Sequence, residues 1–381
     1  MEIGKSIRKD KSVSQYGVNI NAIQSNVQII QNLAGSIPVW AVLKGNGYGL
    51  GLLPMARLLY REGIRRFCIS DVQEAKLLSG ACLESSQILM LQPTQNPEIL
   101  KELLGLPVIC TVSCLEDAQI LNLLATQTQH HAQVHLKIDT GMGRYGFRPD
   151  DVNDILSVCQ LAHLHIGGIY THFASGSSLR KTEKQYRLFL RVIEQIRKAG
   201  FDPGECHCCN STAFLNYPEF HLDGVRIGSA FLGRTPEQQK YGLKPVSFCQ
   251  SRIEEIQTLR KGQASGYAGA WKARKDTRLA MIPVGWYHGF GVAYNRDIFR
   301  LRDCIRGCLS WAKAWVTEKR LWVTVNGCRC PVCGHIGMLY TAVDVSDIFC
   351  EIGDPVILDI SPLLQKGLPL AYQYEEDFTQ I

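Results

Sequence analysis

The chain has 381 residues, enough for two or three domains, each with its own hydrophobic core. Hydrophobic residues make up 46% and charged residues 20%, which excludes an intrinsically disordered chain. The net charge of +6 comes from 41 basic and 35 acidic residues spread along the chain, so we expect no nucleic-acid partner.

The first ten residues are polar and charged and precede no apolar segment, and no window approaches the ~18 apolar residues of a membrane-spanning helix. We therefore expect a cytoplasmic protein without a membrane partner. The 15 cysteines are numerous. Cys68 and Cys110, however, lie within apolar runs, where reduced thiols act as small hydrophobic side chains.

The first 235 residues alternate short apolar runs with longer segments of helical periodicity, which indicates alternating strands and helices. Eight runs are predicted strands: residues 39–44, 65–70, 87–92, 107–113, 134–139, 165–172, 205–210 and 224–231. The predicted amphipathic helices are residues 52–63, 72–80, 97–105, 114–126, 150–163 and 178–200. Gly63 and Gly200 stand where glycine commonly follows a helix.

Eight parallel strands with intervening helices predict a closed (β/α)8 barrel of the TIM type over residues 15–240, with a doubly wound sheet as the alternative. After residue 240 the pattern changes to short alternating runs, with strands predicted at residues 278–284 and 321–325. Asn326-Gly327 is a hairpin signal. We expect a mostly β C-terminal domain at residues 241–381, against which an N-terminal segment, residues 1–14, packs.

Polar residues stand at or just beyond the carboxyl ends of the predicted strands, where barrels of this type place their chemistry. They are Lys44, Tyr48, Asp139, Arg144, His172, Asn210, Ser211 and Arg226. A primary amine there can form a Schiff base, and small residues with backbone N–H groups can hold a phosphate. Taken singly, each has a plainer interpretation, such as a solvated lysine, a core histidine, or a salt bridge between Arg226 and Asp223.

Five motifs, in order, resemble those of the alanine racemases, which are pyridoxal-phosphate enzymes of fold type III. Residues 41–49, Ala-Val-Leu-Lys-Gly-Asn-Gly-Tyr-Gly, look like the family's cofactor-lysine motif. The others are residues 137–147 (Lys-Ile-Asp-Thr-Gly-Met-Gly-Arg-Tyr-Gly-Phe), 170–174, 210–211 and 223–228. The resemblance spans the barrel and much of the β domain, and it implies an amino-acid racemase, with alanine as the leading candidate substrate.

The resemblance implies that Lys44 holds pyridoxal 5'-phosphate, and it assigns the cofactor's phosphate to Tyr48, Ser211, Gly228 and Ser229. Arg144, positioned by Lys137, would lie near the phenolic oxygen and would bind substrate together with Met338. His172 would lie by the ring, and Arg226 would face the pyridine nitrogen. Because a guanidinium stays protonated, it cannot protonate that nitrogen. The cofactor is then a weaker electron sink, which suits racemisation.

Racemisation needs acid–base groups on both faces of the α-carbon, and Lys44 would serve one of them. Tyr267, 19 residues before Trp286, resembles the family's catalytic tyrosine and is the predicted second base. The resemblance implies that the partner of a homodimer with shared active sites supplies it. His172 and Arg226 are the expected helpers in its deprotonation. The plainer interpretation of Tyr267 is a structural tyrosine at a strand edge.

The chain departs from the family at several positions, among them Leu50, Trp286, His288 and Leu339, the last in place of the aspartate that follows Met338 in the family. These departures leave serine, or a broader set of amino acids, as alternative substrates. Tyr372 is the candidate for the family's C-terminal tyrosine, which touches the phosphate.

Cys328, Cys330, Cys333 and His335 raise the alternative of a zinc site. Alternate strand side chains point to opposite faces, so no metal is expected. A decarboxylase or aldolase of this fold type would not need Tyr267 as an opposed base, and a decarboxylase would pair the ring nitrogen with a carboxylate rather than with Arg226. The alternative from another class is a non-catalytic pyridoxal-phosphate-binding relative.

Overall fold

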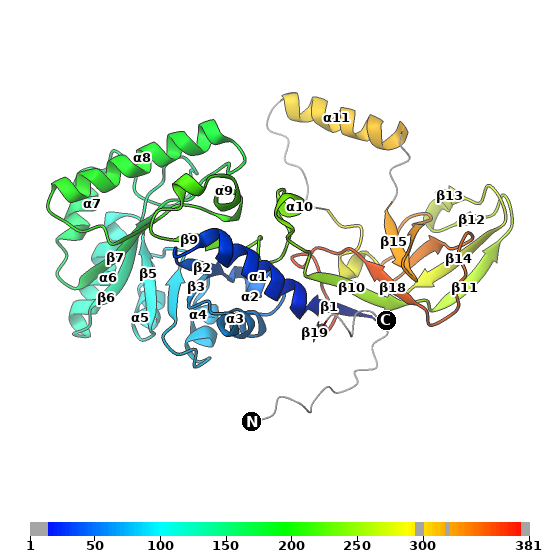
Figure 1. Ribbon diagram of the computed structural model, residues 1–381, viewed down its shortest axis with the longest axis horizontal. Helices are drawn as coiled ribbons and strands as arrows, with labels where there is room; N and C mark the ends of the chain where they lie inside the picture. The colour runs from blue at the N-terminus through cyan, green and yellow to red at the C-terminus, as the bar shows by residue number, and fades with distance from the viewer. Residues whose placement is uncertain (1–13, 294–300, 317–320, 375–381) are drawn as a thin grey trace. The chain divides into compact units, whose positions relative to one another are not determined.

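The computed structural model describes residues 14–293, 301–316 and 321–374 (Figure 1). The chain forms two compact units. One unit is residues Asn21–Val246, and the other comprises the described residues up to Ile20 together with those from Ser247 onward. Nearly all of the expected N-terminal segment, residues 1–14, lies outside the described residues.

The first unit contains an eight-stranded parallel sheet in the order β8, β7, β6, β5, β4, β3, β2, β9. Its strands are β2 (Val39–Val42), β3 (Arg66–Ile69), β4 (Gln87–Met90), β5 (Val108–Val112), β6 (Ala132–Lys137), β7 (Leu164–Tyr170), β8 (Glu205–His207) and β9 (Val225–Ile227). A parallel bridge between His207 and Gly224 connects the two ends of this order, so the barrel is nearly closed. The predicted (β/α)8 barrel is confirmed, and a doubly wound sheet is wrong.

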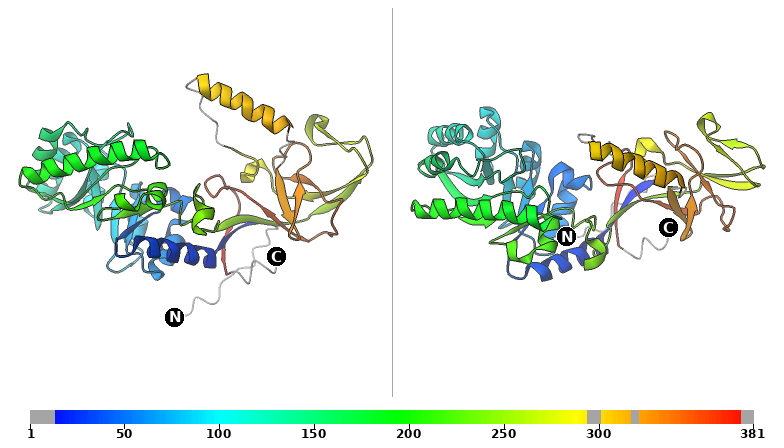
Figure 2. Two further views of the ribbon diagram at one scale, coloured as in Figure 1. Left: turned by 45° about the horizontal axis from the view of Figure 1, so that its top comes forward. Right: turned by 90° about the horizontal axis from the view of Figure 1, so that it is seen from above.

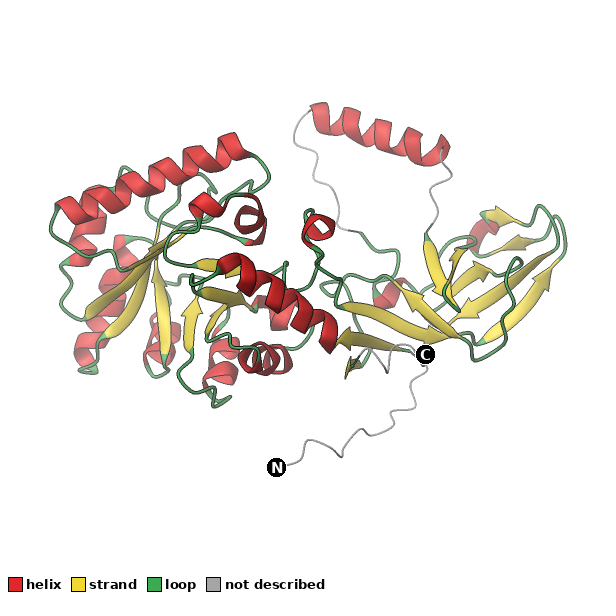
Figure 3. Ribbon diagram, viewed as in Figure 1, coloured by secondary structure: helices red, strands yellow, loops and turns green. Residues whose placement is uncertain are grey.

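Helices surround the strands of this unit, as the views in Figures 2 and 3 show. Six agree with the predicted segments: α3 (Leu52–Arg61), α4 (Val72–Ser79), α5 (Pro97–Leu104), α6 (Leu115–Gln127), α7 (Val152–Cys159) and α8 (Leu179–Lys198). Side-chain caps fix two of their starts, because the Asp71 carboxylate accepts from Gln73 N and the Asn96 oxygen accepts from Glu98 N. The predicted glycines after α3 and α8 have positive φ angles of 91° at Gly63 and 85° at Gly200.

Five shorter or unpredicted elements complete the unit: α1 (Ile20–Ala34), α2 (Lys44–Tyr48), α9 (Ser211–Asn216), η1 (Pro218–Phe220) and α10 (Gln238–Tyr241). Helix α1 buries Ile23, Val27 and Ile30, which recur at helical spacing. That periodicity is legible in the sequence, but the segment precedes the first predicted strand, and we predicted no element there.

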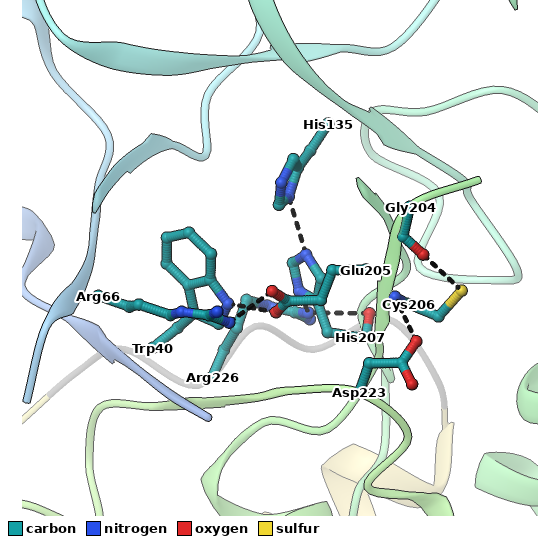
Figure 4. Close-up of polar contacts among 9 residues, drawn as sticks. All are labelled: Trp40, Arg66, His135, Gly204, Glu205, Cys206, His207, Asp223 and Arg226. Atoms are coloured by element: carbon teal, nitrogen blue, oxygen red, sulfur yellow. Dashed lines mark hydrogen bonds and ion pairs between the residues drawn. The ribbon is translucent and has the colours of Figure 1, made fainter. Parts of the chain in front are cut away.

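The interior of the barrel is polar as well as apolar (Figure 4). Trp40 and His207 are fully buried, and His135 is 2% exposed. The indole N–H of Trp40 donates to Glu205 at 2.6 Å, and the other oxygen of Glu205 pairs with Arg66. His135 Nδ1 lies 3.0 Å from His207 Nε2. Buried polar groups of this kind persist because their hydrogen bonds are made within the protein.

Strand β7 carries a bulge opposite His135. Val134 pairs with Ile166, but His135 pairs with Gly168, so that Gly167 is an extra residue on β7. A Cβ atom on Gly168 would lie 2.7 Å from the Glu205 carbonyl oxygen and 2.8 Å from the His135 ring. A Cβ atom on Gly167 would meet nothing closer than 3.6 Å. Of these two adjacent glycines, only Gly168 therefore lacks room for a side chain.

The second unit is mostly β, as predicted. A six-stranded sheet has the order β16, β15, β18, β10, β1, β19, and smaller sheets contain β11, β14, β17 and β12, β13. The bounds are β1 (Gln15–Asn19), β10 (Ser247–Arg252), β11 (Glu255–Leu259), β12 (Ala264–Ser265), β13 (Trp271–Lys272), β14 (Thr277–Ile282), β15 (Trp322–Val325), β16 (Cys328–Pro331), β17 (Thr341–Asp344), β18 (Pro355–Leu358) and β19 (Leu370–Gln373). Asn326 and Gly327, with φ angles of 49° and 78°, form the predicted two-residue turn between β15 and β16.

Helix α11 (Leu301–Val316) was not predicted. Apolar residues recur at helical spacing on one side of it and are well exposed: Leu301 by 78%, Ile305 by 53% and Leu309 by 65%. Its helical period lies within a region that otherwise alternates in the manner of strands. Within the described ranges, no helix is long and apolar enough to cross a membrane.

We predict that Gly168→Ala destabilises the barrel by about 1–3 kcal/mol, because the new methyl group would overlap backbone and a buried ring. Gly167→Ala is the matched control and should change stability by less than about 1 kcal/mol, since its methyl group meets only ordinary contacts. The measurement is the urea concentration at the midpoint of unfolding for both variants. Equal midpoints for the two variants would contradict the role assigned to the bulge.

We also predict that acid destabilises the folded chain through His135 and His207. Burial lowers the pKa of His135 to about 3 and the pKa of His207 well below its ordinary value, with the Arg226 charge adding to both shifts. Unfolded histidines bind protons near pH ~6.5, so below that pH these two side chains bind up to two more protons in the unfolded state than in the folded state. The midpoint of urea unfolding should therefore fall as pH decreases below ~6.5 and should change little above ~7. A midpoint that rises on acidification would refute this account.

Candidate active site at the carboxyl ends of the barrel strands

A cavity of about 360 Å³ lies at the carboxyl ends of the barrel strands. Its lining includes all eight residues predicted to bind the cofactor: Lys44, Tyr48, Arg144, His172, Ser211, Arg226, Gly228 and Ser229. Lys137, Tyr170 and Asn210 line it as well. Four of the lining side chains are lysine or arginine, and none of the described residues that line the cavity is acidic. Such a lining favours an anionic ligand.

Lys44 begins a turn built almost entirely in the left-handed region. Strand β2 ends at Val42, so Lys44 lies just beyond the strand rather than within it. Residues 45–49 have φ angles between 55° and 84°. Three of those five residues are glycines, which adopt positive φ without steric cost, and Asn46 tolerates it better than most side chains. The glycine-rich motif is thus explained by the backbone conformation that follows the lysine.

Glu74 of α4 fastens this turn to the next strand. Its Oε1 accepts from Asn46 N at 2.7 Å, and its Oε2 accepts from Ser70 N at 3.1 Å. The Asn46 side-chain oxygen accepts in turn from Leu52 N at 2.9 Å. One buried carboxylate therefore joins the segments that follow β2 and β3, although the sequence assigned no role to Glu74.

The surroundings of Lys44 favour its neutral amine. Burial lowers its pKa, and the positive charge of Arg144 lowers it further, while Cys68 and Glu74 act in the opposite direction. A lysine with a lowered pKa has a larger neutral fraction at physiological pH. The neutral amine is the form that attacks a carbonyl carbon or accepts a proton.

Hydroxyl and backbone N–H groups gather at one end of the cavity. Ser211 Oγ accepts from Gly228 N at 3.0 Å and from Ala230 N at 3.3 Å. A Cβ atom on Gly228 would collide with the Tyr48 hydroxyl, so any other residue there would displace this hydroxyl. Burial raises the pKa of Tyr48 to about 12, which keeps this hydroxyl protonated and able to donate. These groups form a cradle suited to phosphate oxygens.

Arg226 is 3% exposed and is held by backbone carbonyls and one imidazole. Its Nη1 donates to His207 Nδ1 at 2.6 Å and to His207 O at 3.0 Å, and its Nη2 donates to Thr171 O at 2.5 Å. The alternative of a salt bridge with Asp223 is wrong: Asp223 accepts instead from Cys206 N at 2.9 Å. The guanidinium keeps its full positive charge.

The turn that carries Arg144 is organised by Asp139. Its two carboxylate oxygens accept from the N–H groups of Gly141, Met142, Gly143 and Arg144 at 2.7–3.2 Å. Partial burial raises the pKa of Asp139, but the four backbone donors outweigh that effect and lower it overall. The sequence predicts Asp139 only as a polar residue at a strand end, and in the structure its carboxylate shapes the loop that carries Arg144.

Lys137 and His172 are both influenced by the surrounding cations. Burial, followed by the charges of Arg144 and Arg226, lowers the pKa of Lys137 to about 8. Its ammonium group lies 5.4 Å from the centre of the Tyr170 ring. Burial, followed by the charge of Arg226, lowers the pKa of His172 to about 3. His172 is therefore neutral at physiological pH and can accept a hydrogen bond.

Tyr267 and Met338 belong to the second compact unit. Tyr267 begins the short helix η2 (Tyr267–Gly269) and is 66% exposed, and Met338 is 47% exposed. Trp286 N donates to Gly337 O at 3.0 Å, so the two segments that depart from the family are neighbours. Trp286 is 50% and Leu339 52% exposed.

Two further departures have structural roles. His288 Nδ1 accepts from Gly285 N at 3.1 Å and so closes its own turn. Leu50 is fully buried. Tyr372, the candidate for the family's C-terminal tyrosine, lies in β19, where burial raises its pKa.

The cysteine cluster of the second unit is divided by burial. Cys328 is exposed, whereas Cys330 and Cys333 are buried. In the part of the chain that the structure describes, no group of three or more histidine, cysteine, aspartate or glutamate residues is arranged to hold a metal ion.

Curated relatives point to one family. The chain is 32% identical over 282 residues to the alanine racemase of Desulforamulus reducens, which covers 72% of this chain and 76% of that protein. It is 30% identical over 350 residues to the alanine racemase of Clostridium tetani, covering 90% of this chain and 84% of the relative.

Solved structures share the fold. An alanine racemase of Clostridium difficile superposes with a TM-score of 0.81 at 24% identity, covering 96% of both chains. An alanine racemase from Streptomyces lavendulae gives a TM-score of 0.82 at 22% identity, covering 97% of this chain and 99% of that one. The family models for "Alanine racemase, N-terminal domain" and "Alanine racemase, C-terminal domain" match residues 18–236 and 246–362. The chain therefore belongs to the alanine racemase family.

Proposed function

We propose that this protein is a pyridoxal-phosphate-dependent racemase that interconverts L- and D-alanine. The observation that carries the proposal is the cavity itself, in which a lysine of lowered pKa stands among three further cations and a cradle of hydroxyl and N–H donors. Membership of the alanine racemase family supports the same reaction.

The residues fit a phosphorylated aromatic aldehyde. Lys44 would hold it covalently, and the cradle of Tyr48, Ser211, Gly228 and Ser229 would bind its phosphate. Tyr48 and Gly228 illustrate the fit, since any side chain at residue 228 would fill the space beside the hydroxyl. Arg226 would face the ring nitrogen, His172 would lie beside the ring, and Arg144 would lie near the phenolic oxygen.

When bound, this cofactor supplies an electron sink that makes the α-proton of an amino acid more acidic. The chain's own part is to move that proton. The neutral amine of Lys44 accepts or returns it on one face of the α-carbon, and Tyr267 serves the other face. The 66% exposure of Tyr267 is compatible with its being supplied to a partner's site in a homodimer. A cytoplasmic location is part of the same proposal.

Arg226 would favour proton exchange over other reactions. A guanidinium donates hydrogen bonds but does not give up its proton, so a ring nitrogen held beside it would stay neutral. A cofactor with a neutral ring nitrogen is a weaker electron sink, which would disfavour competing reactions such as transamination. Carbonyl oxygens and an imidazole accept from Arg226, and among the described residues none of its hydrogen-bond partners is a carboxylate.

Serine, or a broader set of amino acids, is the second candidate substrate class. The exposed Trp286 and Leu339 replace residues of the family motifs on the second unit and favour a different substrate entrance. A panel of single L-amino acids, analysed by chiral chromatography, separates the two candidates. Turnover of alanine well above all others supports the first, comparable turnover of several supports the second, and no D-product from any amino acid would refute both.

We predict that Lys44→Ala abolishes racemisation and that Tyr267→Phe lowers it by about 10²–10⁴-fold, the usual range for a lost acid–base group. The measurement is the rate in both directions, from L-alanine and from D-alanine. Tyr60→Phe is the control, because its hydroxyl makes only a surface hydrogen bond to Glu84 O and should not matter. Unchanged rates in Tyr267→Phe would disprove the two-base assignment.

We also predict that Ser211→Ala weakens cofactor binding by about tenfold, as expected for the loss of one hydrogen bond to a charged group. The measurement is equilibrium titration of cofactor-free protein with pyridoxal phosphate, followed by absorbance. Ser157→Ala is the matched control, since its hydroxyl bonds only to Asn153 O on an exposed helix. Equal affinities in the two variants would argue against the phosphate cradle.

A further inference from the structure

A line of three side chains runs from the cavity into the barrel. Arg226 Nη1 lies 2.6 Å from His207 Nδ1, and His207 Nε2 lies 3.0 Å from His135 Nδ1 (Figure 4). The three residues come from β9, β8 and β6. All three are at most 3% exposed, so hydrogen bonds with bulk water do not replace those between them.

The direction of these hydrogen bonds is fixed by the arginine. A guanidinium has donors and no acceptor, so His207 Nδ1 must accept and His207 must carry its proton on Nε2. That proton can be donated only if His135 Nδ1 accepts it, which places the proton of His135 on its own Nε2. Both imidazoles are then neutral, and each bond polarises the next in the same sense.

The barrel makes room for the His135 ring. The bulge at Gly167 shifts the pairing of β6 with β7, and a Cβ atom on Gly168 would lie 2.8 Å from the ring. Trp40 packs edge-on against His135 with ring centres 5.7 Å apart and lies parallel to His207 at 6.0 Å. An extra strand residue and an aromatic wall thus hold an imidazole where the core could otherwise accommodate an apolar side chain.

The carboxylate on the same strand as His207 is directed elsewhere. Glu205 lies two residues before His207 on the same strand, but its oxygens take the Trp40 indole N–H and the Arg66 guanidinium (Figure 4). A carboxylate on either histidine would favour an imidazolium, which could no longer accept from Arg226. Because Glu205 is paired with Arg66, the line of hydrogen bonds from Arg226 ends on the neutral imidazole of His135.

We infer that His135 is a positioning residue: by accepting a hydrogen bond from the Nε2–H group of His207, it keeps His207 Nδ1 open to Arg226 and so holds the guanidinium in the cavity. The inference rests on the proposed function of Arg226 beside the cofactor. His135 itself does not line the cavity.

The test compares His135→Asn with His135→Leu. The two new side chains have nearly the same shape, but only asparagine has an oxygen near the position of Nδ1. We expect His135→Asn to retain kcat within about twofold and His135→Leu to lose about tenfold, because a misplaced active-site group slows the reaction. His165→Leu, which removes an exposed histidine of β7, is the control and should leave kcat unchanged.

A second readout does not depend on the cofactor. In protein labelled with ¹⁵N-histidine and freed of cofactor, the ring nitrogens of His207 report which one carries the proton, and His207→Asn identifies their signals among the ten histidines. We expect a neutral ring with the proton on Nε2 in the wild type and in His135→Asn, and a changed or mixed pattern in His135→Leu.

The outcomes separate the inference from the proposed function. A wild-type His207 that carries its proton on Nδ1, or on both nitrogens, overturns the inference without needing any variant that might fail to fold. Equal kcat and equal His207 signals in the leucine and asparagine variants overturn it as well. A wild type that racemises no amino acid overturns the proposed function, while the proton positions on His207 still decide the inference.

Discussion

A permanent positive charge inside the barrel is the constraint on which the rest of the site depends. Arg226 is buried, and burying a cation is costly unless its donors are satisfied. The structure satisfies them with carbonyl oxygens of Thr171 and His207 and with the His207 ring. This choice of neutral partners leaves the charge uncancelled toward the cavity, where it also lowers the pKa of Lys137 and His172.

Backbone geometry supplies the second half of the site. The left-handed turn after β2 and the Asp139-centred loop after β6 each use glycines to bring N–H groups and a basic side chain to the same mouth. Each is secured by one carboxylate, Glu74 or Asp139, that accepts only from backbone N–H groups. These two carboxylates therefore bond to loop backbone and do not pair with the basic side chains, so the lining keeps its excess of positive charge.

The barrel was predictable because buried parallel strands read as continuous apolar runs, and the family motifs placed the cofactor residues within those runs. The partners of Arg226 and Asp223 were not predictable, since closeness in sequence suggests a salt bridge between them and does not reveal that Asp223 accepts from the backbone of the neighbouring strand. His135 and His207 lie inside predicted strands. The alternation of side chains along a strand does not show that the barrel interior is polar, so their contacts could not be predicted. Helix α1 was missed although Ile23, Val27 and Ile30 repeat at helical spacing, and α11 because its surroundings alternate as strands do.

The bulge in β7 has a consequence for how this site could have changed. If β6 and β7 paired without the bulge, so that His135 paired with Gly167, Lys137 would pair with Ile169 in place of Tyr170, and Tyr170 would turn to the opposite face of the sheet. The stacking of Tyr170 on His207 and its contact with Arg226 would both be lost. The geometry of the site is therefore recorded in the register of two strands as well as in their residues, because one extra residue in β7 decides which of its later side chains face the cavity.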